Sequence, residues 1–425
     1  MKILVIGSGA REHAIAWALT GQADDREVFC GPGNAGTEAL ATNLPLDPEE
    51  PRAVLAAVRE LGIELVVVGP EGPLDAGLVD VLTEAGVKAF GPPRAAAMLE
   101  CSKSSARAFS ERWGIPCART ERFSDARDLR RFLDRSRGAR IVLKKSGLAA
   151  GKGVLESDDA AELTSFGEAV LVEDELLAEE FLVGKELSVF ALCDGHDILL
   201  LPACADHKKA GADDTGPNTG GMGAVCPVPY AGTEEMEGIR REIVEPTFRG
   251  MEAEGLLYKG VLFFGVMVTE TGPKLLEYNV RFGDPETQSL LPLLETDLGD
   301  LCLRVSEGDL GSQSLRFSGR TACGVVIAAP GYPGAYSKGL PVELPSLEEG
   351  HLLFHASTCW GRNGRVLTGG GRCFTAVGVG EGWAAARKEA YALAARVRFD
   401  GAWHRPDIGD KIFGEGASRP DPYRS

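Results

Sequence analysis

Polar side chains alternate along residues 274–288, which read KLLEYNVRFGDPETQ. We expect Leu275 to Phe282 to form a strand. Because successive strand side chains point to opposite faces, Glu277, Asn279 and Arg281 would then share one face. Mg²⁺ usually takes one or two oxygen ligands from protein and completes its octahedron with phosphate and water. The pattern therefore predicts a magnesium site at Glu277 and Asn279, with the Arg281 guanidinium free to bind a phosphate or carboxylate. An amphipathic strand with a solvated face is the alternative.

The next residues, Asp284, Pro285 and Glu286, have the types typical of a helix start. Asp is a favoured N-cap, proline is tolerated in the first turn, and an acid is stabilised near the positive end of the helix dipole. We therefore predict a structural role for Asp284.

A glycine-rich loop between two predicted strands carries the second group of polar residues, in RIVLKKSGLAAGKGVLES at 140–157. Lys144 ends the first strand and Lys152 lies in the loop. Glycine lets the backbone approach a polyphosphate closely, and the loop provides Gly147, Gly151 and Gly153. The order GxxxxGK[ST] is absent, so this is not a Walker A loop. A plain hairpin with solvated lysines is the alternative.

The strand-turn-strand segment at 176–195 has an acidic edge. Its backbone could offer hydrogen bonds to an adenine from Glu179, Glu180, Phe181 and Leu182, and Glu186 could hold ribose hydroxyls. Taken alone, it is a hairpin with acidic residues.

Residues 204–223 read CADHKKAGADDTGPNTGGMG and show no periodicity. Loops of this length without regular structure are usually functional or disordered in compact domains. Its His207, Lys208 and Lys209 would add cations to an acidic protein, and the backbone amides from Asn218 to Gly221 could bind an anion. We predict an active-site loop.

The first 100 residues alternate short apolar runs with helical patterns, which is typical of a parallel sheet wound with helices. Three loops would follow its first three strands, at 7–12, 31–37 and 69–74. They would meet at the carboxyl edge of the sheet, where such folds bind ligands. A dinucleotide-binding fingerprint requires glycine at the position of Glu12 and an acid at the position of Cys30, and both are absent. We therefore predict a phosphate or ribose site and no NAD site.

The remaining pattern divides the chain into three predicted domains. An α/β parallel-sheet domain covers 1–100, a nucleotide-binding domain covers 101–318 with a mobile lid subdomain at about 117–182, and a small α+β domain covers 319–425. The change of pattern near 100 follows Pro92 and Pro93, and from about 318 short strands with glycine turns replace the earlier pattern.

Composition narrows the function classes. The chain has 425 residues, 44% hydrophobic and 25% charged, and a formal net charge of -17, which argues against binding nucleic acid or an anionic membrane surface through a general basic field. Ten scattered cysteines without a CxxC pair indicate free thiols in a reducing compartment. No signal peptide and no long apolar run is found, so a cytoplasmic location is expected.

Taken together, these motifs resemble the ATP-grasp superfamily, and within it the glycinamide ribonucleotide synthetase family. The resemblance spans nearly the whole chain, and it rests most strongly on SGLAAGKGV, GPNTGGMGA and RFGDPETQ. It implies a pre-ATP-grasp N-terminal domain and an ATP-dependent carboxylate-amine ligase of de novo purine biosynthesis. Glycine would react through glycyl phosphate with 5-phosphoribosylamine, with ATP and Mg²⁺ (or Mn²⁺) bound and with no nucleic-acid or membrane partner. A monomer is expected.

The resemblance also implies residue roles. Lys103, Lys144 and the glycine loop would contact ATP phosphates, Glu179 to Leu182 adenine, Glu186 ribose, and Glu277 with Asn279 the metal. The groups expected at the reacting centre are Arg281 and Lys208. The substrates would contact Gly9, Arg11, Asn34, Glu71, Asp206, His207, Asn218, Gly220 and Gly221.

The chain departs from the family pattern at two places, and three alternative functions are open. Lys145 stands where the family often has a small residue, which would place an extra cation beside the phosphates. The segment between Gly153 and Glu179 is shorter than usual and lacks a glycine-rich lid. A different ATP-grasp ligase, an ATP-grasp carboxylase and a non-catalytic nucleotide-binding relative are the alternatives.

Overall fold

The structure is a computed structural model that describes residues 1–413 except 24, 150–152, 312 and 349. The N-terminal sheet is parallel, with strand order β3-β2-β1-β4-β5. The side chains of β1 alternate between two cores: Ile3 and Val5 pack with α1 and with α12 (Leu298–Glu307), and Leu4 and Ile6 pack with α2, α3 and α4. The predicted α/β organisation is thus confirmed. The elements are β1 (Lys2–Gly7), α1 (Ala10–Gly21), β2 (Glu27–Pro32), β3 (Thr42–Asn43), α2 (Pro51–Leu61), β4 (Leu65–Val68), α3 (Glu71–Asp75), α4 (Leu78–Glu84) and β5 (Lys88–Phe90).

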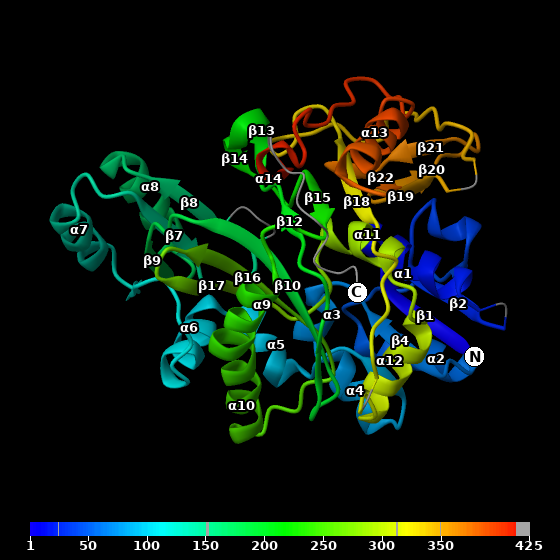
Figure 1. Ribbon diagram of the computed structural model, residues 1–425, viewed down its shortest axis with the longest axis horizontal. Helices are drawn as coiled ribbons and strands as arrows, with labels where there is room; N and C mark the ends of the chain where they lie inside the picture. The colour runs from blue at the N-terminus through cyan, green and yellow to red at the C-terminus, as the bar shows by residue number, and fades with distance from the viewer. Residues whose placement is uncertain (24, 150–152, 312, 349, 414–425) are drawn as a thin grey trace.

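A four-stranded antiparallel sheet, β11-β10-β16-β17, forms the centre of the molecule (Figure 1). One side packs against Phe109 of α6 and Ile243, while Phe190 and Phe263 lie in the core shared with α1 and α12. Its elements and the helices around it are α5 (Arg94–Cys101), α6 (Lys103–Arg112), β10 (Lys185–Cys193), β11 (Ile198–Leu200), α9 (Thr233–Ile239), a π-helical turn (Arg240–Val244), α10 (Glu245–Ala253), β16 (Gly260–Thr269), β17 (Gly272–Asn279), α11 (Glu286–Leu290) and α12 (Leu298–Glu307).

A separate lobe carries the sheet β6-β9-β7-β8, with α7 and α8 packed on it (Figure 1). Its core is a cluster of its own that includes Phe123, Leu129, Leu143 and Leu163. This lobe spans most of the predicted lid. Its elements are β6 (Thr120–Phe123), α7 (Ala126–Arg135), β7 (Ile141–Lys145), β8 (Val154–Ser157), α8 (Ala160–Val170) and β9 (Leu176–Glu180).

The last sheet has the order β12-β15-β18-β22-β19 and packs against α13. It joins strands from both sides of the domain boundary predicted at 318/319, a boundary that stays a prediction. Its elements and their neighbours are β12 (Ala205–Asp206), β13 (Lys209–Gly211), β14 (Thr215–Asn218), β15 (Gly223–Cys226), β18 (Thr321–Ala328), β19 (Leu352–His355), β20 (Thr358–Trp360), β21 (Val366–Thr368), β22 (Arg372–Gly380), α13 (Trp383–Ala394) and α14 (Asp410–Phe413).

The prediction that residues 204–223 lack regular structure is wrong. They contain β12 and the β13–β14 hairpin, and β15 starts at Gly223. These strands have two to four residues, too few to produce a recognisable alternation in the sequence.

No helix among the described residues is both long and apolar enough to cross a lipid bilayer.

Candidate active site

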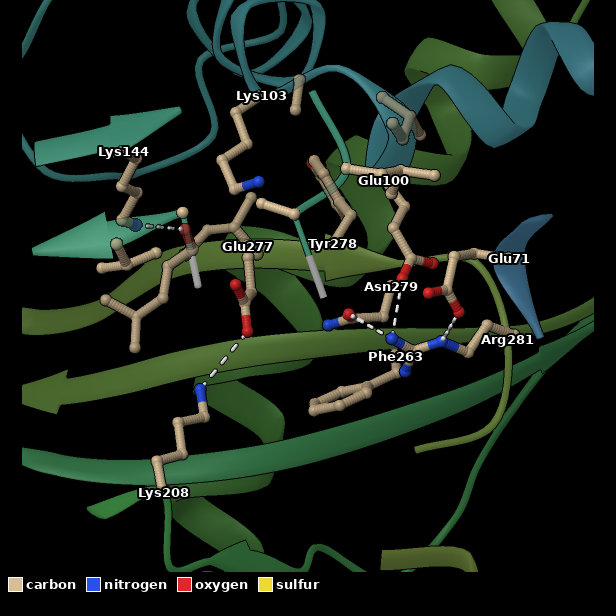
Figure 2. Close-up of a pocket in the computed structure, with 18 of the residues that line it drawn as sticks. Glu71, Glu100, Lys103, Lys144, Lys208, Phe263, Glu277, Tyr278, Asn279 and Arg281 are labelled. Atoms are coloured by element: carbon tan, nitrogen blue, oxygen red, sulfur yellow. Dashed lines mark hydrogen bonds and ion pairs between the residues drawn. The ribbon is translucent and has the colours of Figure 1, made fainter. Parts of the chain in front are cut away.

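A cavity of about 220 Å³, lined by several charged side chains, lies where the lobe, the central sheet, and helices α5 and α6 meet. Figure 2 shows side chains from these elements, and Lys208 from the segment between β12 and β13, pointing into it: Glu100, Lys103, Lys144, Lys208, Glu277 and Asn279. The sequence had placed five of these six residues in one nucleotide and substrate site. The structure brings them together from segments up to about 180 residues apart.

Glu277 lies among three lysines. Its carboxylate forms an ion pair with Lys208 Nζ at 3.3 Å, and Lys144 and Lys103 lie on the other side of this carboxylate (Figure 2). Lys208, and then the two other lysines, lower the pKa of Glu277 to about 2. Glu277 is therefore an anion held among lysines, and a carboxylate ligand for a phosphate-bound cation must carry such a charge.

Asn279 is buried beside Glu277, and its Oδ1 accepts a hydrogen bond from Arg281 Nη2 at 3.0 Å. A carbonyl oxygen has two lone pairs, so Oδ1 can accept this bond and also ligate a cation. Its Nδ2 is buried without a hydrogen-bond partner. Among the described residues no group of three or more His, Cys, Asp and Glu side chains could hold a metal ion. The pair therefore fits a Mg²⁺ ion that takes most of its ligands from phosphate and water.

Arg281 lies beyond the strand, because β17 ends at Asn279 and not at Phe282 as predicted. Its Nη2 donates to Glu100 at 2.7 Å and its Nε pairs with Glu71 at 3.4 Å. These two carboxylates fix the guanidinium at the wall of the cavity (Figure 2).

Lys144 and Lys103 approach the cavity from β7 and from the start of α6. Lys144 Nζ pairs with Glu179 at 2.7 Å and donates to the Leu276 carbonyl at 3.2 Å. Lys103 Nζ donates to the Gly147 carbonyl at 3.5 Å. Burial is the main cause that lowers the pKa of Lys103. Both lysines thus present positive charge beside the glycine loop.

The glycine loop is described only at its ends. Gly151 and Lys152 lie outside the described residues. The amide of Gly147 donates to Asp174 at 2.9 Å, and Gly153 lines the cavity. Lys145 Nζ pairs with Glu173 at 2.8 Å. The prediction that Lys145 places an extra cation beside the phosphates is therefore wrong. Lys145 follows Lys144 in β7, so the two side chains point to opposite faces of the strand.

Of the segment predicted to receive adenine, Glu179 to Leu182, only Glu179 lines the cavity. Glu179 is buried and uses its side chain on Lys144 and Arg107. Glu180 pairs with Arg119 at 2.8 Å. The Arg140 guanidinium lies over the Phe181 ring, 4.5 Å from its centroid. Phe181 and Leu182, just beyond β9, are half-buried.

Lys208 connects β10 with β17. Its Nζ donates to Glu186 at 2.6 Å and to Glu277 at 3.3 Å. Burial would lower the pKa of Lys208, but these carboxylates raise it well above its ordinary value. Lys208 thus stays charged between the predicted ribose and metal residues.

His207 has a structural role, and the predictions that it is a cation and a substrate ligand are wrong. Its ring is fully buried, and Nε2 accepts the Gly409 amide at 2.8 Å. Nδ1 therefore carries the proton that it donates to the Gly223 carbonyl at 3.2 Å. Burial lowers its pKa to about 4, so the ring is neutral.

The neighbouring loop residues divide between the cavity and the hairpin. Asp206 and Gly220 line the cavity, while Asn218 pairs with Lys209 in β13–β14. Gly221 has φ +104°, and a Cβ there would lie 2.4 Å from Pro285 and 2.7 Å from Asp206. Burial and the charge of Glu286 raise the pKa of Asp206 well above its ordinary value.

The N-terminal loops meet at one sheet edge, as predicted, but three of the expected substrate ligands make contacts within the protein. Asn34 Nδ2 donates to the carbonyls of Ser8 and His355, and its Oδ1 accepts the amides of Gly36 and Thr37. Arg11 Nη1 donates to the Phe282 carbonyl at 2.9 Å. Gly9 caps α1 and donates its amide to Glu12. Of this group Glu71 lines the cavity.

Several cavity residues were not found from the sequence. Asp284 was predicted to be an N-cap, yet α11 has Pro285 at that position, and the Asp284 carboxylate pairs with Arg372 at 3.4 Å. Arg107 could have been found, because it lies four residues after Lys103 and so shares its helix face. The remaining charged residues of this kind are Glu100 and Glu286.

Comparison with known proteins agrees with this architecture. Family models for phosphoribosylglycinamide synthetase match its N domain at residues 1–100, its ATP-grasp (A) domain at 101–287 and its C domain at 322–411. Phosphoribosylamine-glycine ligase of Vibrio parahaemolyticus is 42% identical over 424 residues, covering 96% of this chain and 98% of the relative. The Salmonella typhimurium ligase is 43% identical with the same coverage.

Solved structures show the same fold. The crystal structure of phosphoribosylamine-glycine ligase from Thermotoga maritima has a TM-score of 0.82 and 36% identity, and covers 96% of this chain and 100% of that one. The biotin carboxylase domain of Hydrogenobacter thermophilus 2-oxoglutarate carboxylase, solved with MgADP, shares the fold at 17% identity and a TM-score of 0.69, covering 95% and 91%. The chain belongs to the phosphoribosylglycinamide synthetase family of ATP-grasp proteins.

Proposed function

We propose that this protein ligates glycine to 5-phosphoribosylamine, producing glycinamide ribonucleotide, ADP and phosphate. The observation that carries the proposal is the convergence of Glu277 and Asn279 with Lys103, Lys144 and Lys208 in one cavity, in a chain of this family. The likeness to carboxylases supports the fold alone, because those structures are 17% identical or less.

The chemistry needs activation of a carboxylate. Oxide is a poor leaving group, so the glycine carboxylate first attacks the γ-phosphorus of ATP and gives glycyl phosphate and ADP. The amine of 5-phosphoribosylamine then attacks the carbonyl carbon, and phosphate leaves. Such transfers depend on alignment and charge neutralisation. No side-chain nucleophile is required.

The residues of the cavity provide these functions. Lys103, Lys144 and the glycine loop would hold the ATP phosphates, and Glu277 with Asn279 would hold Mg²⁺. When bound, Mg²⁺ would neutralise charge on the phosphate oxygens. Mn²⁺ could occupy the same oxygen site. Glu179 to Leu182 would bind adenine and Glu186 ribose.

The substrate side is assigned to the part of the cavity away from Lys103 and Lys144. Arg281 would orient the glycine carboxylate or the transferred phosphoryl group. Lys208 would offset the negative charge of these two groups. The remaining proposed substrate contacts are Glu71, Asp206, Gly220 and backbone groups of the N-terminal loops.

The test measures ADP release from ATP, glycine and freshly prepared 5-phosphoribosylamine. Glu277→Ala should lower turnover by at least about a hundredfold, the scale of removing one key electrostatic group. Glu307→Ala, which removes an exposed ion pair with Lys88, is the matched control and should leave turnover unchanged. Full activity of Glu277→Ala would refute the metal assignment. ATP hydrolysis that depends on bicarbonate, and not on glycine with the amine, would refute the ligase.

A further inference from the structure

Arg107 is a buried arginine at the back of the cavity that the assigned roles leave unused. It projects from α6 one helical turn after Lys103, and its side chain is 5% exposed. Nε donates to Glu179 at 2.6 Å, Nη1 to the Leu275 carbonyl at 3.1 Å and Nη2 to the Leu276 carbonyl at 2.9 Å. A guanidinium is a rigid planar fork, so these bonds fix three acceptors relative to one another.

Two of these acceptors belong to a β-bulge in the strand that carries Glu277. Gly265 pairs with Glu277, but the next residue, Val266, pairs with Leu275, so Leu276 is the extra residue of β17. A bulge bends the strand and changes the direction of the side chains that follow it. The carbonyls that Arg107 holds are therefore those that set the direction of Glu277 and, two residues later, Asn279.

The third acceptor connects Arg107 with Lys144. Glu179 accepts from Arg107 through Oε1 and from Lys144 Nζ through Oε2 at 2.7 Å, and Lys144 also donates to the bulge carbonyl of Leu276. Lys144 and Glu179 belong to β7 and β9 of the lobe, whereas the bulge belongs to the central sheet. One buried network thus joins the lobe to the strand with the metal-binding residues.

We propose that Arg107 is a positioning residue for nucleotide and metal: it holds the bulge of β17 and, through Glu179, the ammonium of Lys144 in the arrangement that MgATP requires. This inference rests on the proposed function for the roles of Lys144 and Glu277. It assigns to Arg107 no contact with glycine or with the amine substrate.

Arg107→Met removes all three hydrogen bonds, and Arg107→Lys keeps the charge but cannot reach three separate acceptors. Residues that orient metal ligands from behind typically affect metal affinity or activity by about 10- to 100-fold. Arg107→Met should raise the Kd for MgADP and the Mg²⁺ concentration needed for half-maximal turnover by this factor. The KM values for glycine and 5-phosphoribosylamine, measured at saturating MgATP, should stay within about twofold of wild type. Arg107→Lys should recover part of the loss.

Arg26→Met is the matched control, because Arg26 is also a buried arginine in an ion pair, with Asp297, on the N-terminal domain. It should lower the melting temperature without changing the Kd for MgADP. The inference is overturned if Arg107→Met and Arg107→Lys bind MgADP with wild-type affinity, or if the KM for glycine rises as much as that for MgATP. If Arg107→Met does not fold, the comparison of Arg107→Lys with wild type decides. Calorimetry with MgADP needs no ligation, so a wild type that binds MgADP but does not ligate would refute the proposed function and leave this test intact.

Discussion

Arg372 offers a sharp test of how the C-terminal sheet supports the substrate side of the cavity. It starts β22, and its Nη1 donates to the carbonyls of Gly220, Gly221 and Asp284. Its Nη2 pairs with the Asp284 carboxylate at 3.4 Å. The hydroxyl of Tyr332 accepts the Gly220 amide at 3.0 Å from the same side. Arg372→Met would therefore release the loop that leads to Gly221.

The magnitude follows from the number and exposure of these bonds. A hydrogen bond from a charged group contributes about 1.5–3 kcal/mol. The Arg372 side chain is 21% exposed and water can replace part of the loss, so we expect a total near the lower end, about 2 kcal/mol. If the loop must be ordered for catalysis, 2 kcal/mol corresponds to roughly a 30-fold fall in kcat/KM for glycine and for the amine.

The assay varies glycine and 5-phosphoribosylamine separately at saturating MgATP and measures MgADP binding by calorimetry. The Kd for MgADP should remain at the wild-type value, since Arg372 contacts the substrate loop and not the residues assigned to the nucleotide. Arg320→Met is the control: Arg320 precedes β18 of the same sheet, is 43% exposed and pairs with Glu381, and its loss should have little effect. Weaker MgADP binding with unchanged substrate kinetics would refute the reasoning.

Two further predictions concern the same region. Gly221→Ala should reduce turnover by at least about tenfold, because an alanine is strained at this positive φ and its Cβ would collide with Pro285 and Asp206. Wild-type rates for purified, folded Gly221→Ala would contradict this. Asp407 should contribute to acid sensitivity, since burial would raise its pKa but hydrogen bonds from Arg405 lower it to about 2. A lowered pKa means that the stabilisation is complete above the ordinary pKa near 4 and is lost as the pH falls towards 2. The free energy of unfolding, measured in urea, should therefore fall more between pH 6 and pH 3 in the wild type than in Asp407→Asn. An identical dependence of this free energy on pH in the two proteins would disprove the role of Asp407.

The sequence itself determined the local chemistry. The spacing of Glu277 and Asn279 in a strand, the glycine loop after Lys144 and the alternating elements of the first 100 residues depend on short-range periodicity, and short-range periodicity is preserved in a sequence. For the same reason the α/β organisation of the N-terminal domain and the convergence of its loops at one sheet edge could be predicted.

Only the tertiary structure decided which polar groups face the cavity and which support it. Asn34 and His207 have residue types that bind ligands, but the packing of His355 and Gly409 against them satisfies their side chains. The sequence places Arg107 on the helix face of Lys103, but the carbonyl groups that Arg107 and Arg372 hold are brought to them only by distant segments of the folded chain. Hydrogen-bond partners separated by more than 100 residues leave no periodic signal, so the chain must fold before a buried polar group can be assigned to ligand binding or to structure.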